Sequence, residues 1–352
     1  MSVSVDAASH PLDPRAGSLR LPLIGGWVPR RGVLVAGVVG VSAIVLAVLA
    51  LGMGDLPLTP AEVLEALFAT DGGFASTVVR DWRLPRALAA LIFGSALAVS
   101  GAVFQSMTRN PLGSPDVIGF ATGSYTGALV ALTVIGSGVV TASVGALAGG
   151  LLTAVVVYLL AYRRGMLGFR LIIVGIAVTA FLHAVNLFLL LRAQEEVAMA
   201  AAIWGTGSLS LISWEVLVPA MIGLLLCTPG LLLVSPLRQL ELGDDAAAAH
   251  GVSVEASRIA MVLFAVALVA MVTASTGPIA FVSLAAPQLA RRLTGSAGIP
   301  IVSSAMVGAM ILLGADLIAQ HALPVDLPVG IVTVVLGGVY LLTLLVQEAR
   351  RR

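Results

Sequence analysis

The segment from Arg83 to Gly127 concentrates the polar side chains that this chain carries between apolar runs. It opens with the two arginines of the sequence RLPR, Arg83 and Arg86. Arginine pairs are suited to bidentate recognition of carboxylates on a partner. Arginines at the end of an apolar run can also simply extend from lipid into water. We favour partner docking for this pair and keep extension into water as the alternative.

The same segment continues with a lone amide, Gln105, and with a charged break that contains Asn110 and Pro111. Three glycines at four-residue spacing follow in the next apolar run: Gly119, Gly123 and Gly127. That spacing places them on one face of a helix, where they allow a neighbouring backbone to approach closely. A lipid-exposed helix needs none of these features, so we expect the segment to pack around a pathway.

Ionisable side chains are otherwise nearly absent from the apolar runs, and buried charge in lipid is expensive and usually functional. We expect Asp316 to pair with a helix end or a nearby arginine, with a transport role as the alternative. His183 and Asn186 are expected to form interhelical hydrogen bonds. Cys227 is expected to be inert packing.

The sequence has no Cys/His metal cluster, phosphate-binding GxxxxGK[ST] loop or catalytic triad pattern. We therefore expect no catalytic residue, metal or cofactor in this chain, and any energy for transport must come from another polypeptide.

The composition explains why so few polar residues stand out. The chain is 59% hydrophobic and only 11% charged, against about 25% charged residues in soluble proteins. A helix needs roughly 20 apolar residues to cross a bilayer. We therefore predict an all-α integral membrane protein with about ten transmembrane helices. The predicted spans are 33–52, 87–107, 115–135, 143–162, 171–191, 214–234, 257–276, 279–293, 301–320 and 328–347.

The arginines predict the orientation, because cytoplasmic loops are enriched in basic residues. With the N-terminus inside, fifteen of the nineteen arginines fall inside and four outside. Both termini are therefore expected in the cytoplasm. Residues 1–32 are predicted to be a disordered cytoplasmic tail, and residues 33–352 the membrane domain.

Two connections between spans are long enough to hold structure of their own. The external segment 53–82 contains LTPAEVLEALF, which predicts a short helix capped by Thr59 with Pro60 at its first position. In the internal segment 235–256, four alanines between Gly243 and Gly251 favour a short helix for docking a partner, with a solvated loop as an equal alternative. The blocks 83–191 and 257–347 begin on opposite sides of the membrane, as in an inverted repeat.

The run RLPRALAALIFGSALAVSGAVFQSMTRNPLGSPDVIGF resembles the permease family of ABC importers for ferric siderophores, cobalamin and haem. Further matching stretches are LGDDAAAAHGV, GPIAFVSLAAPQLARRLTG and ADLIAQHALPVDLPVGIVTVVLGG. They occur in the family's order from about residue 33 to the C-terminus. VIGFATGSYTGALVAL and WGTGSLSLISW look closest to ferric-enterobactin permease subunits.

The resemblance implies a permease in the bacterial cytoplasmic membrane that pairs with a second permease subunit, in a homodimer or a heterodimer. Two ATPase subunits, which bind ATP and Mg, would contact the internal segment through the positions Gly243, Asp244, Ala248, His250 and Gly251. An extracytoplasmic substrate-binding protein would dock at the positions Arg83, Arg86 and Gln320. The resemblance implies a ferric siderophore as substrate, and a pathway at the interface of the two permease subunits.

The sequence departs from the family pattern at a few positions. Where the family often carries an arginine after the ninth-span aspartate, this chain has Gln320. Ser283 and Gln288 replace a glycine and a histidine, and His250 replaces a leucine. Alternative functions are a cobalamin or haem permease, an ion-coupled secondary transporter and, least supported, a membrane-embedded enzyme.

Overall fold

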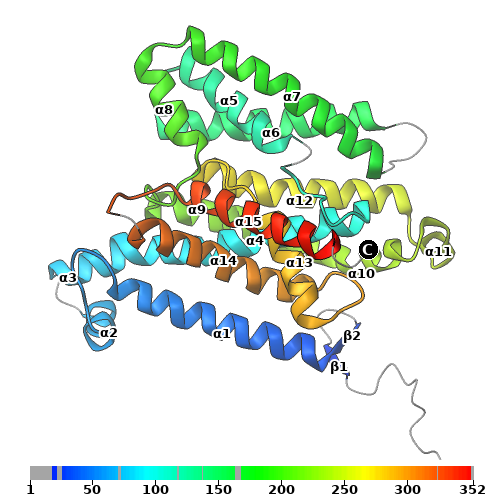
Figure 1. Cartoon of the computed structure of the whole chain (residues 1–352), viewed down its shortest axis with the longest axis horizontal. Helices are drawn as coiled ribbons and strands as arrows, with labels where there is room; N and C mark the ends of the chain where they lie inside the picture. Colours follow the sequence, from blue (N-terminus) through cyan, green and yellow to red (C-terminus); the bar gives the residue numbers. More distant parts are fainter. Residues whose placement is uncertain are drawn as a thin grey trace, which may run out of the picture.

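The computed structural model describes residues 18–21, 26–69, 73–116, 119–136, 138–162, 168–322 and 324–349, and helices dominate it (Figure 1). The elements are β1 (Ser18–Leu21), β2 (Gly26–Pro29), α1 (Arg30–Gly52), α2 (Pro60–Phe68), α3 (Phe74–Thr77), a π-helical turn η2 (Val78–Arg83), α4 (Leu84–Thr108), α5 (Phe120–Val134), α6 (Val139–Ala161), α7 (Gly168–Arg192), α8 (Glu195–Gly205), α9 (Trp214–Leu226), a 3₁₀ segment η3 (Thr228–Leu233), α10 (Val234–Glu241), α11 (Asp244–Ala249), α12 (Val254–Thr276), α13 (Val282–Thr294), α14 (Ile301–His321) and α15 (Val329–Ala349).

Nine of the ten predicted spans each correspond to one α-helix, and the sixth, 214–234, covers α9 and the 3₁₀ segment η3. In the described part of the chain, seven helical stretches are long and apolar enough to cross a membrane, and Phe120–Val134 and Val329–Thr343 are shorter apolar helices. The chain is therefore a multi-pass membrane protein. The eighth span corresponds to α13, which has only 13 residues and includes Pro287. Its buried side packs against α4 and α14, so it needs little contact with lipid of its own.

The helix α4 forms the centre of the molecule, with α12, α13 and α14 packed around it (Figure 1). It is the most extensively buried helix because small residues line it on several sides. Gly94 lies against the backbone of Gly308 in α14, and a Cβ atom on either glycine would overlap with the other's carbonyl oxygen. Gly101 is similarly close to the backbone of Ser283 in α13. These contacts leave α4 little room to shift relative to its neighbours.

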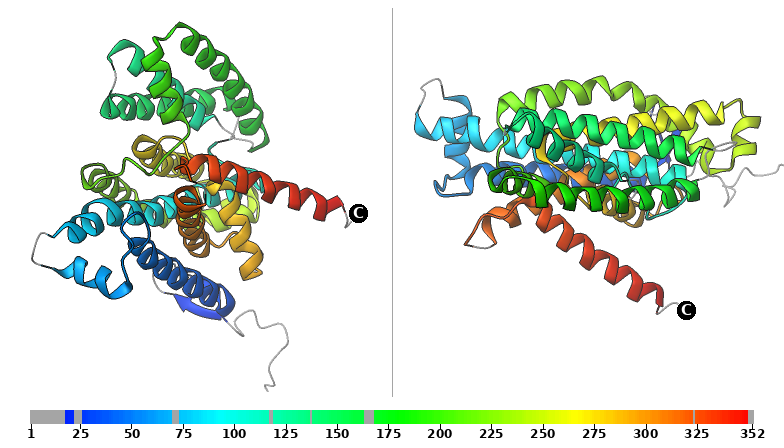
Figure 2. Two further views of the ribbon diagram at one scale, coloured as in Figure 1. Left: turned by 60° about the vertical axis from the view of Figure 1, so that its left-hand side comes forward. Right: turned by 90° about the horizontal axis from the view of Figure 1, so that it is seen from above.

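The helices α5 to α8 gather on one side of this centre, and α1 lies on the opposite side beside α14 (Figures 1 and 2). The helix α15 extends away from the bundle toward the C-terminus (Figure 2). The short helices α2 and α3 lie at one end of the central helices, whereas α10 and α11 lie at the other (Figure 1). The two long connections of the sequence thus occupy opposite ends of the bundle.

The predicted short helices in these connections are confirmed. Thr59 caps α2, with Pro60 in its first turn, and the Glu62 side chain accepts a hydrogen bond from the Thr59 backbone N–H at 2.7 Å. The helix α11 lies between Gly243 and Gly251, as the four alanines predicted. The helix α8, which was not predicted from the sequence, begins with two glutamates at positions that favour acidic residues.

The N-terminal segment differs from the expected disordered tail in its described part. Residues 18–21 pair with residues 26–29 as antiparallel strands, and α1 begins at Arg30 rather than at residue 33. The alternation of leucine with polar residues in SLRL favours a strand over an irregular chain. Residues 1–17, 22–25 and 350–352 lie outside the described residues.

Candidate functional site

The N-terminal end of α4, which the sequence predicts to face outside and which is called its outer end below, carries a buried ion pair. Arg86 donates from Nε to Asp316 Oδ2 at 3.0 Å and from Nη2 to Asp316 Oδ1 at 2.9 Å. Gln320, one helical turn after the aspartate, donates from Nε2 to the same Oδ2 at 2.8 Å. The Asp316 side chain is only 2% exposed. The expectation that Asp316 pairs with an arginine is therefore confirmed, and two of the predicted docking residues meet on this one carboxylate.

The second arginine of the pair binds backbone oxygens. Arg83 donates from Nη1 to the carbonyl of Leu51 and from Nη2 to the carbonyl of Leu56, both at 2.8 Å. These contacts fasten the end of α1, and the loop that follows it, to the start of α4. Carbonyl oxygens satisfy the donors of a guanidinium but do not cancel its positive charge. Arg83 interacts electrostatically with the nearby Asp55 but forms no close ion pair among the described residues, whereas Arg86 is paired directly with Asp316.

Both arginines line a depression of about 310 Å³. Trp82 and Ser210 contribute further wall residues, and Asp316 and Gln320 face the same space from α14. A space of this size accepts a protein side chain rather than a large chelate. Two arginines, one carboxylate and an amide around it make the depression a candidate site for a carboxylate-bearing partner.

Toward its other end, α4 is fixed to α13 by Gln105. Its Nε2 donates to the carbonyl of Leu284 at 2.9 Å, and its Oε1 accepts from Gln288 Nε2 at 2.6 Å. Gln105 is 1% exposed. Pro287 has no N–H, so it leaves the carbonyl of Ser283 without its helical partner. Gly101 of α4 packs directly against that carbonyl.

The two departures from the family pattern in α13 thus have definite partners. Gln288 bonds to Gln105, and the hydroxyl of Ser283 donates to Asp116 Oδ2 at 2.9 Å. The sequence did not reveal these partners, because they lie far away in the chain. One hydrogen bond connects α13 to α4, and the other connects it to the loop before α5.

The C-terminal end of α4, which the sequence predicts to face the cytoplasm and which is called its inner end below, contacts the segment predicted to bind ATPases. Arg109, which ends α4 in the left-handed conformation (φ 50°), donates from Nη2 to the carbonyl of Leu240 at 2.6 Å. The same nitrogen lies 3.2 Å from Asp244 Oδ1. Asp244 also accepts two hydrogen bonds from Nη2 of Arg258, at 2.8 and 2.9 Å.

The break after α4 is shaped by the residues that follow Arg109. The side chain of Asn110 accepts a hydrogen bond from the Leu112 backbone N–H at 2.9 Å, which closes a tight turn. Pro111 within this turn prevents the helix from continuing. Neither residue lies in a described cavity, and their part in a pathway stays a prediction.

The predicted coupling positions fall into two kinds. Gly243 (φ 123°) and Gly251 (φ 81°) hold backbone conformations that residues with side chains rarely adopt. Between them, Ala248 and His250 are exposed, and Ala247 is buried against the membrane helices. Asp244 is turned toward the arginines of the membrane domain. The exposed members are therefore available to a partner, whereas Asp244 faces this chain.

The glycine face of α5 packs within the chain. A Cβ atom at Gly123 would overlap with the side chain of Thr153, and one at Gly127 with the backbone of Gly145. Gly119 differs, because it precedes α5 in a left-handed conformation (φ 85°) and lies beside Thr179 of α7. The first glycine thus starts the helix, and the other two bring α5 and α6 into close contact.

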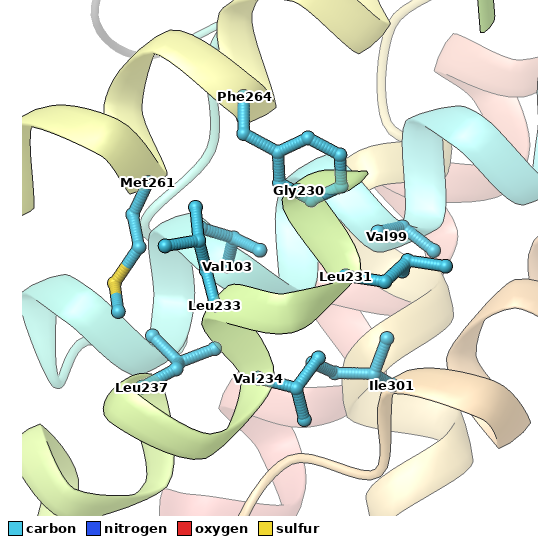
Figure 3. Close-up of a pocket in the computed structure, with 10 residues that line it drawn as sticks. All are labelled: Val99, Val103, Gly230, Leu231, Leu233, Val234, Leu237, Met261, Phe264 and Ile301. Carbon is cyan, nitrogen blue, oxygen red and sulfur yellow. The ribbon is translucent and has the colours of Figure 1, made fainter. Parts of the chain in front are cut away.

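A second small cavity lies between α4, η3 and α12 (Figure 3). Its volume is about 10 Å³, and apolar residues line it, among them Phe264 beside Gly230. A water molecule needs roughly this volume together with polar partners. The cavity is therefore a packing gap beside η3 and not a substrate site.

Other candidates from the sequence have no described site around them. His183 is exposed on α7. Asn186 is buried, and neither polar atom of its side chain has a hydrogen-bond partner in the described residues, so its expected interhelical bond is not found there. Cys227 is a free, partly buried cysteine.

Comparison with known proteins identifies the family of the chain. The model of the FecCD transport family matches residues 42–347, which is most of the sequence. The chain belongs to the FecCD transport family. The fold and the two polar ends of α4 described above are therefore features of a transport protein.

Curated relatives match over nearly their full lengths. The ferric enterobactin transport system permease protein FepG of Escherichia coli K12 is 48% identical, and the alignment covers 93% of this chain and 99% of the relative. The Fe(3+)-citrate import system permease protein YfmE of Bacillus subtilis is 36% identical, with 92% and 98% covered. The iron(3+)-hydroxamate import system permease protein FhuG of the same species is 33% identical, with 90% and 98% covered.

A solved structure with the same fold is described as an inward-facing conformation of a metal-chelate type ABC transporter. It matches with a TM-score of 0.78 and 28% identity, and the match covers 89% of this chain and 98% of the other. The predicted membrane-permease fold is thereby confirmed.

Proposed function

We propose that this chain is the membrane-spanning permease subunit of an ATP-driven ABC importer for a ferric siderophore. The observation that carries the proposal is the 48% identity, over 93% of the chain, to a ferric enterobactin permease protein. Relatives named for ferric citrate and ferric hydroxamate import support an iron chelate as the substrate class.

The importer would contain two permease subunits in the bacterial cytoplasmic membrane, both with cytoplasmic termini and inverted halves. The pathway would lie between the two subunits, with Gln105, Asn110 and Pro111 and the glycines Gly119, Gly123 and Gly127 in its supporting wall. The near absence of charge from the apolar runs supports a carrier driven by a partner rather than by an ion gradient.

The outer end of α4 would receive the extracytoplasmic binding protein. Arg83 would provide the stronger attraction for a carboxylate, because its own hydrogen bonds are to carbonyl oxygens. Arg86 and Gln320 would contribute less, since both already bind Asp316. Gln320 carries no charge at this position. It would therefore give a weaker docking contact on this subunit than an arginine there would.

The inner segment would receive two ATPase subunits, which bind ATP and Mg. Ala248 and His250 would face the ATPase, because both are exposed on or next to α11. Gly243 and Gly251 would set the orientation of α11, because each takes a backbone conformation that few other residues tolerate. ATP binding and hydrolysis would then switch the permease pair between outward-open and inward-open states.

Uptake in cells that lack the chromosomal copy tests this function. The full chain should restore uptake of ⁵⁵Fe-labelled ferric enterobactin, ferric citrate or a ferric hydroxamate. Restoration should require an intact partner ATPase. Uptake of cobalamin or haem without uptake of any ferric chelate would show that the substrate is not a ferric siderophore. Transport by the chain alone in liposomes, driven by a proton gradient, would overturn the ABC assignment.

A further inference from the structure

Asp244 is the point at which three separate elements meet. It is the first residue of α11, and it binds Arg109 at the end of α4 and Arg258 near the start of α12. The two arginines lie 149 positions apart in the chain. One carboxylate thus joins the segment between α10 and α12 to two central membrane helices.

The end of α4 is held to this segment by further contacts. Arg109 donates to the carbonyl of Leu240 at 2.6 Å, close to the end of α10. The hydroxyl of Ser106, one turn earlier in α4, donates to the carboxylate of Glu241. The joint between α10 and α11 is therefore bound to the end of α4 on both sides of Gly243.

The backbone on each side of α11 offers freedom that these side chains restrict. No heavy atom lies within 4 Å of the position that a Cβ would take at Gly243 or Gly251. Glycine permits more backbone conformations than other residues, so the side-chain contacts of α11 help to fix its orientation. Ala247 supplies an apolar anchor, and Asp244 supplies the polar one.

We propose that Asp244 is the positioning residue that passes movement of α11 to α4 and α12. The proposal rests on the proposed function, because it needs an ATPase that moves α11. The carboxylate is bound by the arginine at the end of α4 and by the one in α12, so Asp244 acts on the membrane helices.

The two ion pairs at Asp244 are unequal. The side chain of Arg258 is 12% exposed, whereas those of Arg109 and Asp244 are 50% and 44% exposed. Exposed ion pairs are weak and reversible. Displacement of α11 therefore releases Arg109 before Arg258, and α12 follows α11 more closely than α4 does.

The test uses the purified complex of both permease subunits, both ATPases and the binding protein in liposomes. Uptake of ⁵⁵Fe-labelled ferric enterobactin, or of the chelate that restored uptake in cells, is measured per ATP hydrolysed. Asp244→Asn removes the charge and keeps the shape. We expect uptake per ATP to fall about fivefold, the size expected from losing two partly exposed ion pairs.

Matched variants separate transmission from general damage. Asp245→Asn removes a charge from the next residue, which is exposed and has no ion pair among the described residues, and should leave uptake per ATP unchanged. Asp244→Glu keeps the charge and should restore most of the ratio. Bound ATPase should match the wild type in all three variants, and thermal stability should fall only slightly in Asp244→Asn.

Two further substitutions test the individual links. Arg258→Gln should lower the ratio more than Arg109→Asn, in which asparagine tolerates the left-handed backbone. If Asp244→Asn cannot be recovered from membranes, uptake per ATP in Arg258→Gln and Arg109→Asn tests the proposal instead.

Equal ratios in Asp244→Asn and Asp245→Asn would overturn the proposal. Loss of bound ATPase from Asp244→Asn at an unchanged ratio would also overturn it, since Asp244 would then act as an ATPase contact. Failure of the proposed function has a different signature, because the wild-type complex itself would then show no ATP-dependent uptake.

Discussion

The two ends of α4 carry aspartate–arginine contacts of opposite character. At the outer end Asp316 is 2% exposed and Arg86 20% exposed, and the pair is bidentate with Gln320 as a third partner. At the inner end Asp244 and Arg109 are each about half exposed, and the carboxylate is shared between two arginines. A buried pair is costly to break, whereas an exposed pair exchanges readily with water.

This difference gives α4 a tightly held attachment to α14 at its outer end and a looser attachment to α11 at its inner end. The outer contact holds α4 against α14, and the glycine contact between Gly94 and Gly308 strengthens that attachment. The inner contact holds α4 to a segment bordered by glycines. A transporter driven from the cytoplasm needs an inner end that responds and an outer framework that keeps its shape.

The largest expected effect comes from breaking the outer pair. Arg86→Ala leaves the carboxylate of Asp316 buried without its countercharge, which typically costs about 3–5 kcal/mol. The free energy of unfolding, measured in detergent by denaturant titration, should fall by that amount. The double variant Arg86→Met, Asp316→Leu should recover most of the stability, because it removes both charges. A small loss in Arg86→Ala would show that the outer pair is not buried.

A smaller stability effect is expected at the inner end. Asp244→Asn should lower the free energy of unfolding by about 1 kcal/mol or less, because its ion pairs are partly exposed. The same titration as for Arg86→Ala gives a direct comparison, with Asp245→Asn as the control. A loss as large as that of Arg86→Ala would make the inner end as rigid as the outer.

The sequence predicts those features of the structure whose interacting residues lie close together in the chain. Local patterns sufficed for the apolar spans, for the cap at Thr59 and for the helix of four alanines between Gly243 and Gly251. Each of these features depends on residues within one or two helical turns. The helix α8 was missed because its alanine-rich stretch is short and lies in a polar loop.

Contacts between distant residues were beyond sequence reasoning. The sequence predicted a helix end or a nearby arginine as the partner of Asp316, but Arg86 is 230 positions away and nothing local selects it over Arg83. Gln105 and Gln288 are likewise 183 positions apart. Asp244 was expected to meet an ATPase, and only the packing of α4 and α12 reveals that its carboxylate faces them.

Salt should distinguish the two ends further. Raising the ionic strength from about 0.05 M to about 0.5 M shortens the screening length from roughly 14 Å to 4 Å and weakens exposed ion pairs. The stability difference between wild type and Asp244→Asn should therefore shrink. The difference for Arg86→Ala should persist, because water and ions hardly reach Asp316. If salt changed both stability differences equally, the contrast between a buried outer ion pair and an exposed inner one would be contradicted.

The smallest effect is expected from restoring an arginine at position 320. Gln320→Arg gives Asp316 a second cation, which leaves more of the charge of Arg86 available to a docking carboxylate. The affinity of the binding protein, measured on the complex in nanodiscs, should rise about threefold, as for one exposed ion pair. Gln320→Glu is the control and should lower the affinity. An unchanged affinity in both variants would remove the outer end of α14 from the docking surface.

Hydrogen exchange of the assembled complex tests the central claim most directly. The complex is compared without nucleotide and with ATP and vanadate, and backbone exchange is followed by mass spectrometry. The account predicts altered exchange in residues 235–258 and 105–113 and little change in residues 84–92 and 312–321. Altered exchange at the outer end, with an unchanged inner end, would contradict a fixed outer and an adjustable inner attachment of α4.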